Sequence, residues 1–168
     1  GELSNKDFLN SDYYNENITF IGNNDNLKKI LKASGLGNPA TMQMFLYILL
    51  VMPKETLSRL DTTTINSWEN ALKTTIQSFN VNVTTTYPGE SSSDLSTVNY
   101  YRHIRNAVSH AKCVYETEKG RTYVTFKDKA PKNSYHCEIK MLTSDVGSIL
   151  EVLQKQIMIY LNGQWSIR

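Results

Sequence analysis

A run of apolar residues, MFLYILLVM (Met44–Met52), is the feature that most constrains how this chain can fold. It follows Asn38 and Pro39, which favour a helix start, and it ends at Pro53. The run is about half as long as the roughly 18 residues that a membrane-spanning helix needs. A helix that is apolar on nearly every side must be surrounded by other elements, so the run predicts the central helix of a helical bundle.

Apolar residues at steps of three and four predict further helices around this run. The segment from Thr62 to Phe79 carries them along one face, and so does the last segment, from Ser144 to Asn162. Shorter helices are expected over residues 24–34 and 94–111. The predicted fold class is therefore mainly α, a bundle of four to five helices.

The pattern changes between the last two helices. From Cys113, strand-forming residues lead to a turn at Gly120 and resume after it, which predicts a β-hairpin. The segment HCEIKML, residues 136–142, is a candidate third strand. We expect a small antiparallel insert of two or three strands over about residues 112–142. The Thr-, Ser- and Gly-rich stretch from Val81 to Ser93 predicts a loop.

One domain accounts for a chain of 168 residues. We expect a polar arm over residues 1–24 and a single domain over residues 25–168, because no linker or repeat divides the rest. The N-terminus lacks the basic and apolar regions of a signal peptide, and two cysteines are too few for a disulfide scaffold. These features predict a cytoplasmic protein that does not enter a membrane.

Positive charge is concentrated in one region. The formal net charge of the whole chain is only +2. Residues 98–140 carry nine Lys and Arg against four Asp and Glu, whereas the remainder carries nine against twelve. A local cationic excess favours a polyanion such as RNA as the partner. A solvated basic surface without a ligand is the alternative.

The segment YYRHIRNAVSHAKCVYE (Tyr100–Glu116) lies in this region and contains two of the three histidines. A helix at roughly 100° per residue separates its side chains into two faces. The predicted core face holds Tyr100, Tyr101, Ile104, Ala107, Val108 and Ala111. The predicted polar face holds Asn99, Arg102, His103, Asn106, Ser109 and His110. Arg105 lies at the margin, where its stem can pack while its guanidinium reaches out.

Three of these residues, Arg105, Asn106 and His110, suit chemistry on a phosphodiester. An imidazole can accept or donate a proton near neutral pH. A guanidinium can hold phosphate oxygens and stabilise the charge of the transition state. Asn106 lies one turn before His110 and can orient the imidazole or the substrate. The alternative is an ordinary polar helix face on which Asn106 and His110 pair locally.

No metal or cofactor site is predicted. His103 and His110 lie two turns apart, roughly 10 Å along a helix axis, which is too far for one ion. His110 and Cys113 have a suitable spacing, but no further pair of ligands accompanies them. The segment SGLGN, residues 34–38, lacks the lysine of a phosphate-binding loop.

The segment RNAVSH (Arg105–His110) resembles the R-x4-6-H motif of the HEPN superfamily, the higher eukaryotes and prokaryotes nucleotide-binding domains. After the motif, a hairpin that ends in FKD (Phe126–Asp128) and a capped last helix are similar to a bacterial branch associated with plasmids and phages. The resemblance covers Asn99 to Leu161.

The resemblance implies a HEPN-like helical bundle that dimerises with its motif helices facing each other. It implies a metal-independent endoribonuclease that acts in toxin–antitoxin systems, in phage defence or on mobile elements. Arg105 and His110 would be catalytic and Asn106 would orient them. Two copies would contribute to one cleft across an isologous interface, which supplies two imidazoles for the base and the acid of RNA cleavage.

The same resemblance suggests further RNA-binding residues, a protein partner and alternative functions. We expect Arg102, His103 and Lys112 to contact RNA. An antitoxin protein is a further candidate partner, although Lys112 stands where some HEPN toxins carry a tyrosine that a partner nucleotidyltransferase modifies. The alternative functions are a non-catalytic HEPN module that binds RNA or a nucleotide, and a structural dimerisation domain in which Arg105 and His110 pair across the interface.

Overall fold

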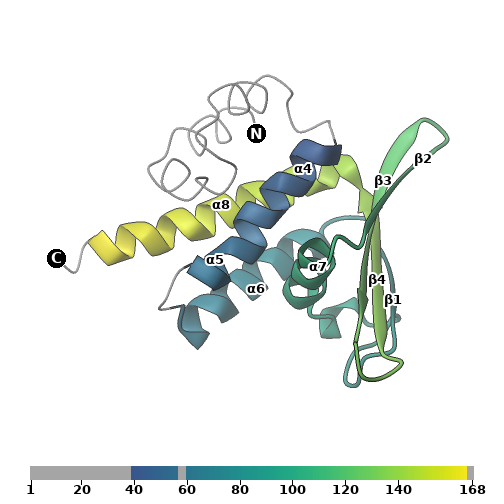
Figure 1. Cartoon of the computed structure of the whole chain (residues 1–168), viewed down its shortest axis with the longest axis horizontal. Coiled ribbons are helices and arrows are strands. Elements are labelled where there is room, and N and C mark those ends of the chain that lie inside the picture. The colour runs from purple at the N-terminus through teal and green to yellow at the C-terminus, as the bar shows by residue number, and fades with distance from the viewer. Residues whose placement is uncertain (1–38, 57–59, 166–168) are drawn as a thin grey trace.

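The computed structural model describes residues 39–56 and 60–165 (Figure 1). Helices gather on one side of the molecule and a β-sheet stands on the other, with helix α7 (Tyr100–Ser109) between them. The polar arm predicted over residues 1–24 and the helix predicted over 24–34 lie outside the described residues. Within the described ranges, no helix combines the length and the apolar character needed to cross a membrane.

The apolar run forms the central helical segment, as its composition indicates. It comprises α4 (Pro39–Leu46), a π-helical stretch η2 (Tyr47–Val51) and α5 (Met52–Thr56). The side chains of its middle turns are buried: Leu46, Leu49 and Leu50 are at 0% exposure.

The apolar run ends at Pro53, but the helical path continues past it, because the short helix α5 runs through this proline. The wider π-helical turn just before it explains this: the backbone N–H of Met52 donates to the carbonyl of Tyr47, five residues back. Such irregular hydrogen bonding accommodates a proline, which has no N–H to donate.

Two longer helices flank the central segment and confirm the predicted apolar stripes. Helix α6 (Thr62–Gln77) begins at Asp61, whose side chain accepts from the Thr64 N–H, and it buries Trp68, Leu72 and Ile76. Helix α8 (Thr143–Trp165) packs against α6, and the Trp68 and Tyr160 rings meet edge to face with centroids 6.3 Å apart. The buried stripe of α8 contains Val146, Ile149, Leu150, Leu153 and Ile157.

The sheet has four antiparallel strands in the order β1-β4-β3-β2. They are β1 (Asn82–Thr85), β2 (Cys113–Glu118), β3 (Arg121–Lys129) and β4 (His136–Leu142). The β2–β3 hairpin turns at Lys119 and Gly120, which both have positive φ angles, of 49° and 76°. This confirms Gly120 as a turn residue.

Strand β1 corrects the prediction of a small insert of two or three strands. It arises from the stretch expected to be a loop and pairs with β4, with Val83 opposite Ile139. The β-branched residues in VNVTTTY favour a strand, but the neighbouring Pro88 and Gly89 made a loop the stronger prediction. The fold is thus a helical bundle joined to a four-stranded sheet.

One face of the sheet packs on the helices. Alternate residues of β3 point the same way, so Val124, Phe126 and Asp128 share a face and all three are buried. Ile139 and Met141 of β4 are buried as well. Helix α7 contacts β3 on this side, and strand periodicity therefore turns the carboxylate of Asp128 towards α7.

Candidate functional site

Helix α7 carries the candidate motif, and both of its ends are defined by capping contacts. The Asn99 side chain accepts from the backbone N–H of Arg102 at 3.0 Å, which caps the N-terminus. The helix ends at Ser109 and His110 is the C-cap. Tyr100, Tyr101, Ile104, Ala107 and Val108 are buried, as the predicted core face requires.

The C-terminal cap of α7 is a Schellman motif. The N–H of Lys112 donates to the carbonyl of Ala107 at 2.7 Å, and the N–H of Ala111 donates to that of Val108 at 3.2 Å. Ala111 has the left-handed φ of 52° that this cap needs. It is exposed and outside the helix, so its predicted place on the core face was wrong. The cap leaves His110 exposed at the helix end.

Arg105 and Asn106 lie in contact. The guanidinium of Arg105 donates through Nη2 to Asn106 Oδ1 at 3.1 Å, and its carbon Cζ lies 5.8 Å from the centre of the Tyr101 ring. Asn106 in turn donates through Nδ2 to Asp128 Oδ2 at 3.3 Å. The backbone N–H of His110 donates to the carbonyl of Asn106 at 3.0 Å, so the imidazole lies one turn beyond this pair.

An open groove of about 900 Å³ begins at this end of α7 and follows strands β3 and β4. Lys112, one of the residues predicted to contact RNA, borders it. Of its two acidic residues, Asp128 is turned towards α7 and Glu138 lies 3.7 Å from Lys127. The groove is lined by His110, Lys112, Lys127, Asp128, Lys129, Pro131, Asn133, Ser134, His136 and Glu138. Cationic and imidazole groups therefore outnumber carboxylates along it.

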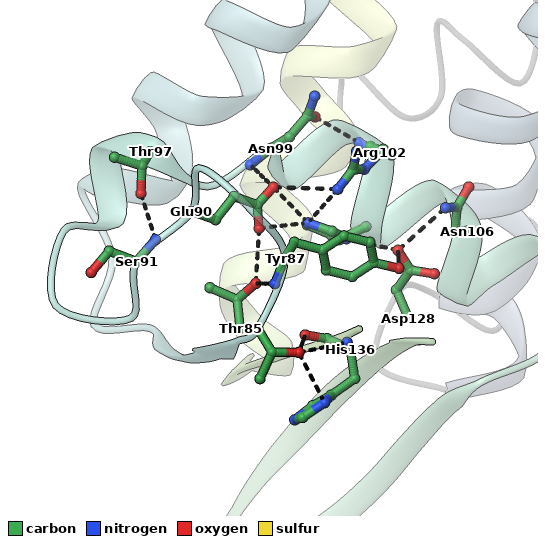
Figure 2. Close-up of polar contacts among 12 residues, drawn as sticks. Thr85, Tyr87, Glu90, Ser91, Thr97, Asn99, Arg102, Asn106, Asp128 and His136 are labelled. Carbon is green, nitrogen blue, oxygen red and sulfur yellow. Dashed lines mark hydrogen bonds and ion pairs between the residues drawn. The ribbon is translucent and has the colours of Figure 1, made fainter. Parts of the chain in front are cut away.

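His103 is not on an exposed face, contrary to the helical-wheel prediction. Its side chain is 1% exposed and lies between two carboxylates. Nδ1 is 2.7 Å from Asp128 Oδ2, and Nε2 is 2.9 Å from both oxygens of Glu90. Figure 2 shows the contacts of this network. Because both ring nitrogens are engaged inside the protein, the predicted contact of His103 with RNA would require this network to open.

Glu90, in the loop after β1, is the other end of this network (Figure 2). It accepts from the Asn99 N–H at 3.3 Å and from the Thr85 hydroxyl at 2.9 Å. Nη2 of Arg102 lies 3.5 Å from Glu90 Oε1. The guanidinium of Arg102 also stacks over Tyr87, 4.6 Å from the ring centre, while its side chain stays 41% exposed. The guanidinium of Arg102 is thus partly accessible from solvent.

Three residues of this network are of the types that bind metal ions, but the distances between them are those of hydrogen bonds. Glu90, His103 and Cys137 place their donor atoms within 4.8 Å of one another, and they are the only such group in the described part of the chain. The contact of 2.9 Å between His103 and Glu90 is a hydrogen-bond distance, and Arg102 supplies a positive charge beside it. Burial raises the pKa of the Cys137 thiol to about 12, so it is a neutral thiol near neutral pH.

Asp128 and Glu90 were not among the predicted site residues. A signal for Asp128 was present, because the alternation of β3 continues from Val124 and Phe126 to Asp128 and turns a carboxylate inwards. A buried carboxylate needs donors, which marks a polar partner on the facing element. Glu90 lies in an irregular loop, and no periodicity points to it.

Comparison with known proteins supports the family resemblance over nearly the whole chain. No curated protein and no solved structure matched. A family model, HEPN pEK499 p136, matches residues 2–163. The match extends well beyond Asn99–Leu161, the segment on which the resemblance was first based. The chain belongs to this family of HEPN proteins.

Proposed function

We propose that this protein is an endoribonuclease that cleaves RNA without a metal ion, through Arg105, Asn106 and His110. The observation that carries the proposal is the position of His110, which is exposed at the end of α7 and borders a groove rich in lysine. Membership of a HEPN family supports an RNA-related activity. Toxin–antitoxin systems, phage defence and mobile elements are the settings we propose for it.

The groove supplies the electrostatic argument. Lys112, Lys127 and Lys129 can each contact a phosphate, and contacts with the backbone make binding strong and dependent on salt. The groove is partly open to solvent and follows β3 and β4 from the end of α7, so it has room for an extended strand. Single-stranded or loop RNA is the substrate we propose, because an unpaired strand can adapt to the groove.

The chemistry requires a base, an acid and a group that stabilises charge. His110 accepts the proton of the 2′-hydroxyl as its oxygen attacks phosphorus and the bond to the 5′-oxygen breaks. An acid returns a proton to the 5′-oxygen, which leaves a 2′,3′-cyclic phosphate and a 5′-hydroxyl. Arg105 stabilises the additional charge on the phosphoryl oxygens, and Asn106 holds the guanidinium through its Oδ1.

A second copy of the chain would supply the acid. One α7 carries one exposed histidine, whereas a two-fold axis beside the end of α7 brings two copies of His110 to one phosphate. We therefore propose a homodimer whose cleft is formed by both motif helices.

The direct test is cleavage of end-labelled single-stranded RNA in excess EDTA, with His110→Ala purified in the same way. Lys119→Ala, at the tip of the β2–β3 hairpin, is the matched surface control. We expect the parent and Lys119→Ala to produce 2′,3′-cyclic phosphate ends, and His110→Ala to produce none. Cleavage by all three proteins would identify a contaminant or a different active site. Absence of cleavage by the parent across several RNAs would favour the non-catalytic module that binds RNA or a nucleotide.

The dimeric cleft has its own test. The parent and His110→Ala are unfolded together, refolded in varied proportions, and assayed at constant total protein. If each cleft needs His110 from both copies, activity falls as the square of the parent fraction. A linear fall would show that each protomer works alone.

A further inference from the structure

A continuous chain of side chains joins the loop after β1 to the candidate catalytic pair. It runs from Glu90 to His103, then to Asp128, Asn106 and Arg105, with contacts of 2.9, 2.7, 3.3 and 3.1 Å. Three separate parts of the fold contribute to it, namely a loop, helix α7 and strand β3. Figure 2 labels Glu90, Asp128 and Asn106 of this path.

One carboxylate oxygen is the junction of the chain. Asp128 Oδ2 lies 2.7 Å from His103 Nδ1 and accepts from Asn106 Nδ2 and from the Tyr87 hydroxyl, both at 3.3 Å. Burial and the neighbouring Asp128 raise the pKa of Tyr87, which keeps its phenol a donor. Asp128 is 6% exposed, and it also borders the groove.

The junction determines which way the Asn106 amide points. An asparagine side chain offers a donor on one side and an acceptor on the other. With Nδ2 donating to Asp128, Oδ1 is left to accept from Arg105. The reversed amide would place an oxygen against the carboxylate and present NH₂ to the guanidinium, so that both contacts would become repulsive.

His103 fixes the junction. Both of its nitrogens face carboxylate oxygens, and a neutral imidazole donates through only one nitrogen. His103 Nδ1 makes the shortest contact of Asp128 Oδ2, at 2.7 Å, and removal of the ring would leave a buried carboxylate short of a partner.

We propose that Asp128, held by His103, is a positioning residue that sets the orientation of Asn106 and through it the Arg105 guanidinium. This inference rests on the proposed ribonuclease function. It assigns no contact with RNA to His103. The proposal gives His103 a role in holding Asp128, although a helical wheel places His103 on the same polar face as the proposed catalytic residues.

The test is a double-mutant cycle of Asp128→Asn and Asn106→Ala, measured as kcat and KM on one RNA. Asparagine keeps an acceptor for His103 but no longer selects one orientation of Asn106. We expect Asp128→Asn to lower kcat by up to about 100-fold, the scale of a misplaced reacting group. KM should stay equal or fall, because a negative charge is lost beside the groove.

The cycle separates positioning from stability. In the Asn106→Ala background, Asp128→Asn should change kcat by less than about 3-fold, because no amide is left to orient. Glu118→Gln removes a carboxylate from an exposed ion pair with Lys140 elsewhere on the sheet, and it should leave kcat unchanged. An equal loss of kcat in both backgrounds would overturn the proposal, because a structural role acts whether or not Asn106 is present.

A second readout works without catalysis. The side-chain NH₂ of Asn106 can be followed by ¹H–¹⁵N NMR and identified by its loss in Asn106→Ala. We expect it to exchange slowly with solvent in the parent and in Glu118→Gln, and at least 10-fold faster in Asp128→Asn. Unchanged exchange in Asp128→Asn would overturn the positioning role. If the parent cleaves no RNA but exchange responds as expected, the ribonuclease proposal fails and the orientation of Asn106 by Asp128 stands.

Discussion

The turn after helix α7 offers a prediction that depends on backbone geometry alone. Ala111 has a φ of 52° at the position of a Schellman cap where glycine is the usual residue. Its two neighbouring cap bonds, Lys112 N–H to Ala107 O and Ala111 N–H to Val108 O, use only backbone atoms. Ala111→Gly therefore keeps every hydrogen bond of the cap and removes only a strained Cβ.

The magnitude follows from two opposing contributions. A residue other than glycine in the left-handed region costs about 1–2 kcal/mol, which glycine does not incur. Glycine loses about 0.5–1 kcal/mol through the greater freedom of the unfolded chain. Ala111 is exposed, so no packing is lost. The difference is a gain of up to about 1.5 kcal/mol in the free energy of unfolding, centred near about 0.75 kcal/mol, or a rise in Tm of up to about 6 °C.

The assay is chemical denaturation of the parent, Ala111→Gly and Ala71→Gly. Ala71 is half-buried in the middle of α6, where the same substitution should cost about 1 kcal/mol. The two variants should thus shift the midpoint in opposite directions. A loss of stability in Ala111→Gly as large as that in Ala71→Gly would refute the left-handed geometry at the end of α7, and with it the backbone arrangement that exposes His110.

Two further predictions concern charge and pH. Replacing Lys127 and Lys129 together by Gln should flatten the dependence of log Kd for single-stranded RNA on log salt concentration by about 1.4, or about 0.7 for each lost phosphate contact. Lys119→Gln should leave that slope unchanged, and an equal effect of both changes would remove the groove from the proposal. Burial raises the pKa of Cys113 to about 11 and that of Cys137 to about 12, from an ordinary value of 9.0. The neutral thiols therefore stabilise the fold below about pH 9, and this contribution should fall as the pH rises towards 11–12. The measurement is the free energy of unfolding at alkaline pH. It should fall more steeply with pH in the parent than in Cys113→Ala. A loss of equal steepness in the variant would show that the half-buried Cys113 thiol does not contribute to it.

The parts of the fold that depend on local periodicity could be predicted from the sequence. The stripe containing Trp68 and Leu72 in α6 is buried as expected. The turn at Gly120 needs a positive φ, and a glycine in the sequence indicates such a position because it adopts positive φ without strain. Strand β1 could not be predicted in the same way, because its partner β4 lies far along the chain and pairs Val83 with Ile139. A strand of four residues has little periodicity of its own.

In the candidate site, too, contacts between neighbours in the sequence could be predicted, whereas contacts between distant segments could not. Arg105 and Asn106 are adjacent in sequence, and the structure places their side chains in contact. Asp128 comes from β3 and Glu90 from a loop, so their meeting at His103 depends on how the sheet docks against α7. A helical wheel gives the direction of a side chain but does not show what lies opposite it.

The polar face of α7 therefore has two parts that the sequence cannot separate. At its N-terminal half, the loop after β1 and strand β3 cover the face, and His103 becomes an internal group with 1% exposure and a carboxylate on each nitrogen. At its C-terminal end the same face stays open, and His110 borders a groove that the sheet extends with lysines. Polar groups that are covered must be satisfied by partners within the fold, whereas those left open are free to act on a ligand. His103 and His110 look equivalent in the sequence, and their different burial is the reason we propose a positioning role for the first and a catalytic role for the second.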